Sequence, residues 1–180
     1  MIGLLMAAAL AIRTRELDQP VVRFHPTRHY RSAVLARACY YDRATGIAPS
    51  AKAVADANRV MQPTGEPPLM EWLACVGYLA VGREDTVIPR ATAVVAWVAG
   101  AMPLSQLTTR LASPGGALIG AALYLFLPYG IVASRNFQPA AAGVPAAALA
   151  GWLAAAAWPP YAATRRSISR RPEASRRSCS

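Results

Sequence analysis

Three side chains near the start of the chain have the types needed for acid–base chemistry, namely Asp18, His25 and His29. A carboxylate or an imidazole can act as a general base toward a hydroxyl group, so Asp18 and His25 are the candidate catalytic residues. The His-x-x-x-His spacing suits a metal ion on one helix face, but Pro26 interrupts such a helix and only Asp18 lies near enough to be a third ligand. We therefore expect no metal and no other cofactor. The alternative is that the histidines are structural and that Asp18 is a solvated loop residue.

Arginine supplies candidates for binding a phosphate, because a guanidinium group can hold two phosphate oxygens at once. The candidate substrate-binding residues are Arg28, Tyr30, Glu66 and Arg135. Arg135 is the most informative, since it ends a long apolar segment where a loop would begin. Two of these residues also have simpler explanations. An arginine at the end of a membrane helix extends toward water, and an acid such as Glu66 is favoured in the first turn of a helix by the helix dipole.

The chain is organised around one apolar hairpin, 88–139. Nineteen residues without a charge separate Arg90 from Arg110, and 24 more separate Arg110 from Arg135. A helix of about 20 apolar residues crosses a bilayer. Each run therefore predicts one transmembrane helix, with Arg110 in the turn between them. Pro103 and Pro128 lie inside the two spans of the hairpin and should kink them.

Together with the other segments of the chain, the hairpin predicts an all-α, polytopic membrane protein with about four transmembrane helices. The expected segments, in order, are a short or truncated first transmembrane helix at 1–12, an extracytoplasmic loop at 13–87, transmembrane helices at 88–164 and a disordered, basic, cytoplasmic tail at 165–180.

Short amphipathic helices beside the membrane are expected within the long first external loop. Proline and glycine spacing predicts helices at 28–44, at 49–61 and from about 66 to Gly82, where glycine suits a left-handed C-cap. The third helix has a charge-free stretch, 72–82, that is too short to span a bilayer, so we expect it to lie along the membrane surface. Its apolar residues at helical spacing are Trp72, Leu73, Val76, Leu79 and Ala80.

The charge distribution bears on partners and on orientation. The net charge is +10, but the arginines form no stripe interleaved with aromatic residues, so we expect no nucleic acid as a partner. Six arginines at 165–177 favour a cytoplasmic tail under the positive-inside rule. Counting back through the spans puts the turn at Arg110 inside and the loop 13–87 outside.

The three cysteines, Cys39, Cys75 and Cys179, form no Cys-x-x-Cys pair and so indicate neither a zinc site nor a redox motif. Buried free thiols are the favoured interpretation. A disulfide between Cys39 and Cys75 is the alternative.

Several motifs occur in an order that resembles a known family. They are Glu-Pro-Pro-Leu-Met-Glu-Trp-Leu at 66–73, Pro89-Arg90 at the start of the next span, and Leu-x-x-Arg-Leu-Ala at 107–112. Over 1–138 this order resembles the N-terminal part of membrane glycosyltransferases of the family 39 type, which have the GT-C fold and include protein O-mannosyltransferases and lipid A aminoarabinose transferases. The resemblance implies transfer of a sugar from a polyprenyl-phosphate carrier to an extracytoplasmic acceptor. It also implies that the lipid bilayer and a polyprenyl-phosphate-linked sugar are partners, and that the protein lies in the cytoplasmic (inner) membrane of a bacterium.

The chain departs from that family in three respects. Thr27-Arg28-His29-Tyr30 stands where the family often has an acidic pair, so Asp18 is the nearest carboxylate that could replace it. The step at 66–69 lacks the family's lysine. After Pro139 the sequence becomes rich in alanine, which predicts a truncated or frameshifted gene product that is inactive alone. The alternative function is a small, non-enzymatic membrane adaptor or subunit.

Overall fold

The computed structural model describes residues 1–15, 17–18, 26–62, 67–137 and 140–157. Every regular element in these residues is an α-helix, which confirms the all-α class. The helices in chain order are α1 (Ile2–Thr14), α2 (Pro26–Arg43), α3 (Pro49–Val60), α4 (Leu69–Val81), α5 (Val87–Ala99), α6 (Ala101–Leu111), α7 (Pro114–Phe126), α8 (Pro128–Ser134) and α9 (Ala140–Ala157).

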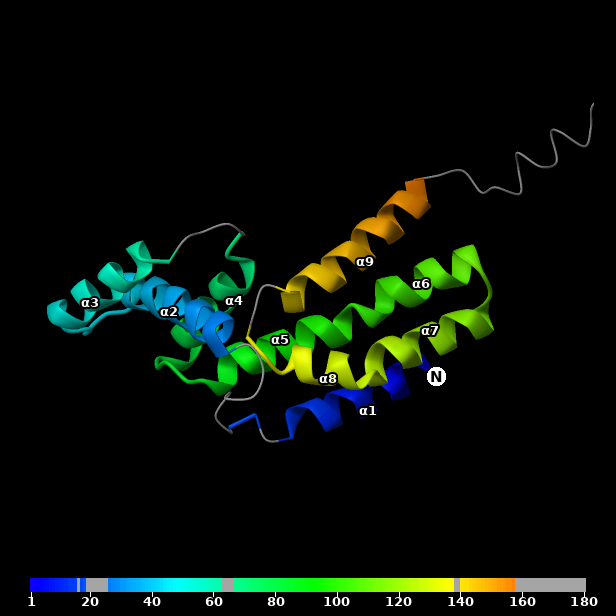
Figure 1. Ribbon diagram of the computed structural model, residues 1–180, viewed down its shortest axis with the longest axis horizontal. Helices are drawn as coiled ribbons and strands as arrows, with labels where there is room; N and C mark the ends of the chain where they lie inside the picture. The colour runs from blue at the N-terminus through cyan, green and yellow to red at the C-terminus, as the bar shows by residue number, and fades with distance from the viewer. Residues whose placement is uncertain (16, 19–25, 63–66, 138–139, 158–180) are drawn as a thin grey trace, which may run out of the picture.

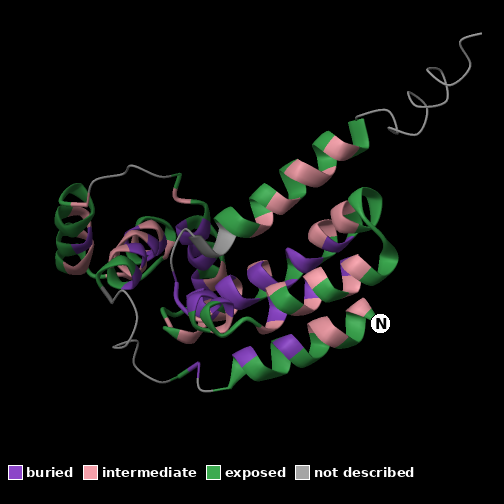
Figure 2. Cartoon of the chain, turned by 45° about the vertical axis from the view of Figure 1, so that its right-hand side comes forward, coloured by how far each residue is buried: buried purple, intermediate pink, exposed green. Residues whose placement is uncertain are grey.

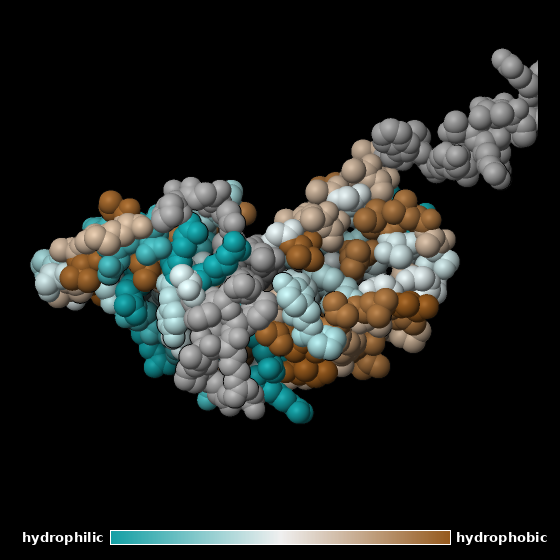
Figure 3. Space-filling view, in the orientation of Figure 1, coloured by the Kyte–Doolittle hydropathy of each residue, from teal (hydrophilic) through white to brown (hydrophobic). Residues whose placement is uncertain are grey.

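The helices form two parts that meet where α4 packs on α5 (Figure 1). The α2–α4 lobe consists of α2, α3 and α4, and α2 packs against both of the others. The apolar bundle consists of α1 and α5–α9, with α6 packed on α7 and α9, and α1 packed on α5 and α7. The face in Figure 3 is more hydrophilic over the lobe and more hydrophobic over the bundle. The two parts therefore differ in the surface that they present.

Two segments of the bundle bear on the predicted membrane spans. Helices α5 and α6 together, Val87–Leu111, form one apolar helix of 25 residues, which is long enough to cross a bilayer. Helices α7 and α8 meet at an angle of 56° and make a second span only if the bent pair crosses together. The bend falls at Pro128 and confirms the kink predicted there. Among the described residues, α1 and Gly143–Ala157 are apolar but shorter, so the arrangement of about four spans stays a prediction.

A one-residue interruption at Gly100 divides α5 from α6, three residues before Pro103. Proline has no N–H, so Pro103 cannot form the helical hydrogen bond to the carbonyl of Ala99, four residues before it. The Tyr124 hydroxyl donates a hydrogen bond to the Trp97 carbonyl at 2.8 Å, and the two rings are stacked. A Cβ atom on Gly100 would lie only 2.7 Å from both the Tyr124 hydroxyl and Cβ of Pro145. Glycine is thus required here because α7 and α9 approach the backbone closely.

The alanine-rich segment after Pro139 forms α9, which packs on α5 and α6. A Cβ atom on Gly151 would lie 3.2 Å from Leu107, so the two helices are close together. The Arg110 guanidinium lies 5.9 Å from the centre of the Trp152 ring and donates to the Ala155 carbonyl at 3.4 Å. Small side chains allow this close packing, and α9 is part of the apolar bundle.

The predicted helices of the lobe occur close to their expected positions. Helix α2 begins at Pro26, slightly before the predicted start, and α3 begins at Pro49 as predicted. Helix α4 ends at Val81, and the φ of 76° at the next residue, Gly82, confirms the left-handed C-cap. Glu66, the expected start of this helix, lies outside the described residues, and α4 begins at Leu69. Local signals therefore predict these helix ends to within a few residues.

The interpretation of Cys39 and Cys75 as buried free thiols is wrong, because the two form a disulfide between α2 and α4. Ala36 on α2 and Ala74 on α4 are both fully buried, and such small side chains let the two helices come close. The Cα atoms of the cysteines are 5.8 Å apart, within the range a disulfide needs. The pairing depends on this tertiary contact, which the spacing in the sequence does not reveal.

Candidate functional site

Three arginines from separate segments meet at one end of the apolar bundle. Arg13 lies in the last turn of α1, Arg90 in the first turn of α5, and Arg135 at the C-cap of α8. We call them the arginine cluster. Buried residues gather where the helices pack together, whereas the outer parts of α3 and α9 are mostly exposed (Figure 2). Arg13 is 0% exposed and Arg90 7%, so most of the cluster is withdrawn from solvent.

Arg13 and Arg135 join the ends of α1 and α8. The Arg13 Nε donates to the Ser134 hydroxyl at 2.8 Å, and its Nη1 donates to the Ala9 carbonyl at 3.3 Å. Arg135 donates in the opposite direction, from Nη2 to the Ile12 carbonyl at 2.7 Å and from Nε to the Arg13 carbonyl at 3.3 Å. The buried Nη2 of Arg13 has no hydrogen-bond partner among the described residues.

Arg90 connects this pair to the chain that follows α1. Its Nε donates to the Arg135 carbonyl at 3.0 Å and its Nη1 donates to the Leu17 carbonyl. The last carbonyls of a helix have no partner within the helix, and a negative partial charge gathers at that end. The C-terminal ends of α1 and α8 therefore offset part of the positive charge of the cluster. The exposed carboxylate of Asp18 lies within electrostatic range of Arg90.

His29 lies between the lobe and the end of the bundle. It is 4% exposed, and its Nδ1 accepts a hydrogen bond from the Phe137 backbone N–H at 3.1 Å. Burial, and then the nearby charge of Arg90, lowers the pKa of His29 to about 4. The imidazole is therefore neutral at ordinary pH and acts as an acceptor between α2 and the segment after α8. This is the structural role considered above for the histidines.

The structure places four of the six predicted site residues. Asp18 and Arg135 lie on segments bound to one another through the arginine cluster. Arg28 and Tyr30 are exposed on the first turns of α2, on either side of buried His29. Within the described part of the chain, Arg28 and Tyr30 make no hydrogen bond to the cluster. The predicted residues His25 and Glu66 lie outside the described residues.

Arg13, Arg90 and Ser134 are members of this site that the sequence analysis did not propose. One signal was available for the arginines. Like Arg135, each borders an apolar segment, and charges that border adjacent spans on the same side of a membrane lie at the same depth. Ser134 carries no comparable signal, since its contact with Arg13 depends on how α1 and α8 pack.

The arrangement is suited to holding an anion rather than a metal ion. Among the described residues, no three His, Cys, Asp or Glu side chains come together as metal ligands would. Among the described residues of the cluster, guanidinium groups outnumber carboxylates, and guanidinium favours phosphate and carboxylate partners. In comparisons with known proteins, no family model matches the chain, and no curated protein or solved structure is detectably similar to it.

Proposed function

We propose that the chain is an integral membrane protein whose arginine cluster binds the phosphate of a lipid carrier, as in transfer of a sugar from polyprenyl phosphate to an extracytoplasmic acceptor. The observation that carries this proposal is the convergence of Arg13, Arg90 and Arg135 at the end of a helix long enough to span a bilayer. A phosphate there would offset the remaining positive charge. It would also give the unpartnered Nη2 of Arg13 an acceptor.

Asp18 extends the proposal from binding to glycosyl transfer. A carboxylate beside the phosphate site could accept the proton of an acceptor hydroxyl as that oxygen attacks the sugar. Asp18 is exposed and near Arg90, so a solvent-borne acceptor could reach it. In this proposal Arg28 and Tyr30 contact the sugar or the acceptor, since both are exposed at the start of α2.

The exposed apolar surface supports the bilayer as a partner. On α4 the outward residues are large and apolar while the opposite face packs against α2. This pattern fits a helix lying in the membrane interface, and Trp72, 62% exposed, is typical of that depth. The exposed apolar residues of α4 are Leu69, Trp72, Leu73, Val76 and Leu79. Those of α5–α8 include Val95, Met102, Ile119, Leu123, Leu127 and Val132.

The disulfide supports an extracytoplasmic lobe. Disulfides persist in oxidising compartments and are rare in the cytosol, so the Cys39–Cys75 bond favours the outside for α2 and α4. The turn at Arg110 would then lie in the cytoplasm. The inner membrane of a bacterium fits this arrangement.

A membrane adaptor without enzymatic activity is the second candidate. Helix α3 and its C-cap expose Val54, Val60 and Met61, the last two by 83% and 77%. Exposed apolar side chains on the part of the lobe farthest from the bundle favour a protein partner there.

Lipid binding by the full chain in nanodiscs tests the proposed phosphate site. Polyprenyl phosphate should bind, whereas the matching polyprenol without phosphate should not. Arg135→Gln removes one guanidinium and should weaken binding of polyprenyl phosphate about tenfold, since a hydrogen bond to a charged group contributes roughly 1.5–3 kcal/mol. Arg110→Gln is the matched control, because Arg110 lies at the other end of the α5–α6 helix. Equal affinities for polyprenyl phosphate and polyprenol would contradict the proposal.

A transfer assay separates the enzyme from the adaptor. With a polyprenyl-phosphate sugar and an acceptor, Asp18→Asn should abolish transfer and leave binding of polyprenyl phosphate unchanged. Unaltered transfer by Asp18→Asn would remove this residue from the chemistry. Binding of the lipid without any transfer by the wild-type chain would agree both with the adaptor and with a transferase that is inactive alone, as expected from the sequence.

A further inference from the structure

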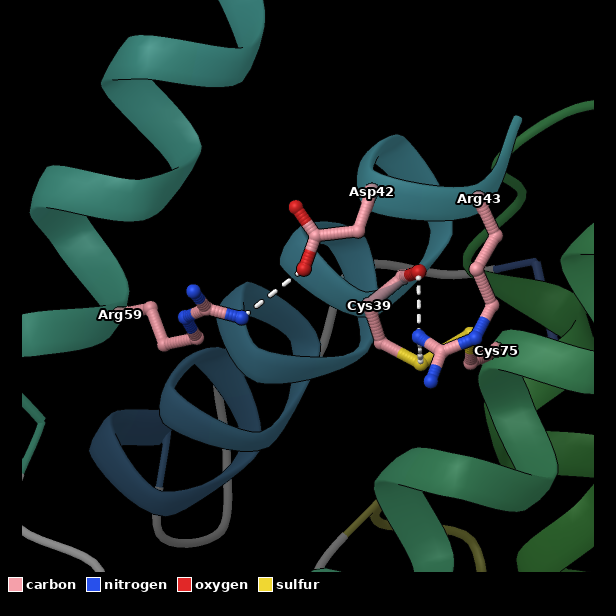
Figure 4. Close-up of a disulfide and its surroundings, with 5 residues drawn as sticks. All are labelled: Cys39, Asp42, Arg43, Arg59 and Cys75. Carbon is pink, nitrogen blue, oxygen red and sulfur yellow. Dashed lines mark hydrogen bonds and ion pairs between the residues drawn. A yellow bond between two sulfur atoms is a disulfide. The ribbon is translucent and has the colours of Figure 1, made fainter. Parts of the chain in front are cut away.

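The two cysteines of the disulfide lie in unlike surroundings (Figure 4). Cys39 is on α2 and half-buried, whereas Cys75 is on α4 and only 2% exposed. A thiol reagent or a donor disulfide approaching the reduced chain from solvent therefore meets Cys39 first. Accessibility alone makes the pair asymmetric.

A positive charge lies against Cys39. The Arg43 Nη1 is 3.0 Å from Cys39 Sγ and donates to the Cys39 carbonyl at 3.1 Å, since the two residues are one helical turn apart. A neighbouring guanidinium stabilises a thiolate and lowers the pKa of the thiol. After reduction, the Arg43 guanidinium that already contacts this sulfur would stabilise the thiolate of Cys39.

The nearest acid on the same helix does not cancel this charge. The Asp42 carboxylate accepts a hydrogen bond from Arg59 on α3 at 2.9 Å, and Figure 4 shows it turned toward Arg59 and away from the sulfurs. Arg59 also pairs with Asp56 at 3.0 Å. Glu84, in the turn after α4, is bound by Arg37 and Tyr41. Arg43 is thereby left beside Cys39.

Cys75 has the opposite surroundings. The buried carboxyl group of Glu71 lies one turn before it on the same face of α4. Tyr78 lies one turn after it, and burial raises the pKa of its phenol to about 12, so that it stays neutral. The remaining neighbours in this core are mainly apolar, among them Met70 and Ala74. A thiolate at Cys75 would therefore be poorly solvated.

From this asymmetry we infer that Cys39 is the thiol that exchanges with a donor protein disulfide and that Cys75 is the resolving thiol. The Cys39 thiolate attacks one donor sulfur, so that a mixed disulfide forms and the second donor sulfur leaves as a thiolate. Cys75 loses its proton and attacks Cys39 Sγ, which releases the first donor sulfur. The cysteine pair gives up two electrons and two protons, and the donor disulfide becomes a dithiol.

Glutathione disulfide is the probe for the test, used on the reduced full chain in detergent micelles. Cys179→Ser is present in all variants, so that only the pair reacts. With Cys75→Ser, the remaining Cys39 should form the glutathione adduct at least about tenfold faster than Cys75 does in Cys39→Ser, by intact mass at neutral pH. Equal rates, or faster reaction of Cys75, would overturn the inference. Equal helix content by circular dichroism shows that both variants are folded.

Charge variants distinguish the proposed role of Arg43 from simple accessibility. Arg43→Gln should move the midpoint of the pH–rate profile for alkylation of Cys39 upward, whereas Arg43→Lys should restore much of the effect. Arg59→Gln should also raise the midpoint, because Asp42 becomes free to bind Arg43. A midpoint that neither Arg43→Gln nor Arg59→Gln moves would overturn the electrostatic part of the inference.

Discussion

The α2–α4 lobe and the apolar bundle are both helical, but different interactions hold them together. In the lobe, a disulfide joins α2 to α4 around a small core, and ion pairs such as Arg37–Glu84 lie at the surface. In the bundle, arginine side chains cross-link helix ends through backbone carbonyls, and α9 packs closely at Gly100. The contrast suggests that loss of the covalent link should loosen the lobe, whereas changes of volume should disturb the bundle.

Removal of the disulfide should have the largest effect. A bond that closes a loop of 36 residues stabilises a chain by about 4 kcal/mol in the loop-entropy estimate. Replacing Cys39 and Cys75 together by Ser should speed amide hydrogen exchange in α2 and α4 and leave α5–α7 unchanged. Cys179→Ser is the control and should change neither part. An equal increase in hydrogen exchange in the bundle would show that the lobe and the bundle unfold as one unit.

Local chemistry predicted much of the fold, and the exceptions involve contacts between distant segments. Pro128 and Gly82 act on their own backbone, so a kink and a C-cap could be predicted from their positions. The disulfide required the packing of α2 on α4, and the arginine cluster required the C-terminal ends of α1 and α8 to meet the start of α5. Arg135 could be proposed from sequence because it borders an apolar run, but its partners, the carbonyls of Ile12 and Arg15, have no signature in the sequence.

His29 should make the stability of the contact between α2 and the segment after α8 depend on pH. Its pKa in the folded chain is about 4, below the ordinary value of about 6.5, so the unfolded chain takes up the proton first as the pH falls. This contribution to stability is complete above about pH 6.5 and is lost between there and pH 4, by up to about 3 kcal/mol. His29→Asn keeps an acceptor for the Phe137 N–H without titrating. The melting temperature should therefore fall less steeply with pH in this variant, and parallel curves would contradict the role of His29.

Gly100 tests the close packing within the bundle. Gly100→Ala introduces a Cβ atom 2.7 Å from Cβ of Pro145 and from the Tyr124 hydroxyl, and overpacking of this kind costs about 1–3 kcal/mol. Gly143→Ala is the matched control on α9, because its Cβ would meet no atom within 4 Å. Melting temperatures in the same detergent give the comparison. If the two variants have equal stability, α9 does not lie against Gly100.

The smallest effect is expected at the surface of the lobe. Arg37→Gln removes the ion pair with Glu84, in which the arginine side chain is 55% exposed. Exposed pairs contribute about 0.2–1 kcal/mol, so the free energy of unfolding in denaturant should change by about 0.5 kcal/mol. The Tyr41 hydroxyl would still donate to Glu84. A loss several times larger would show that the surface charges, and not the disulfide, dominate the lobe.

Labelling from the two sides of the membrane tests whether the lobe is outside and the bundle spans the bilayer. Ser50→Cys and Leu111→Cys, each in a Cys179→Ser background, place single thiols at exposed positions in α3 and at the end of α6. The disulfide keeps the native pair unreactive. In intact cells, a membrane-impermeant maleimide should label position 50 and should label position 111 only after permeabilisation. Equal labelling of both positions without permeabilisation would contradict this account.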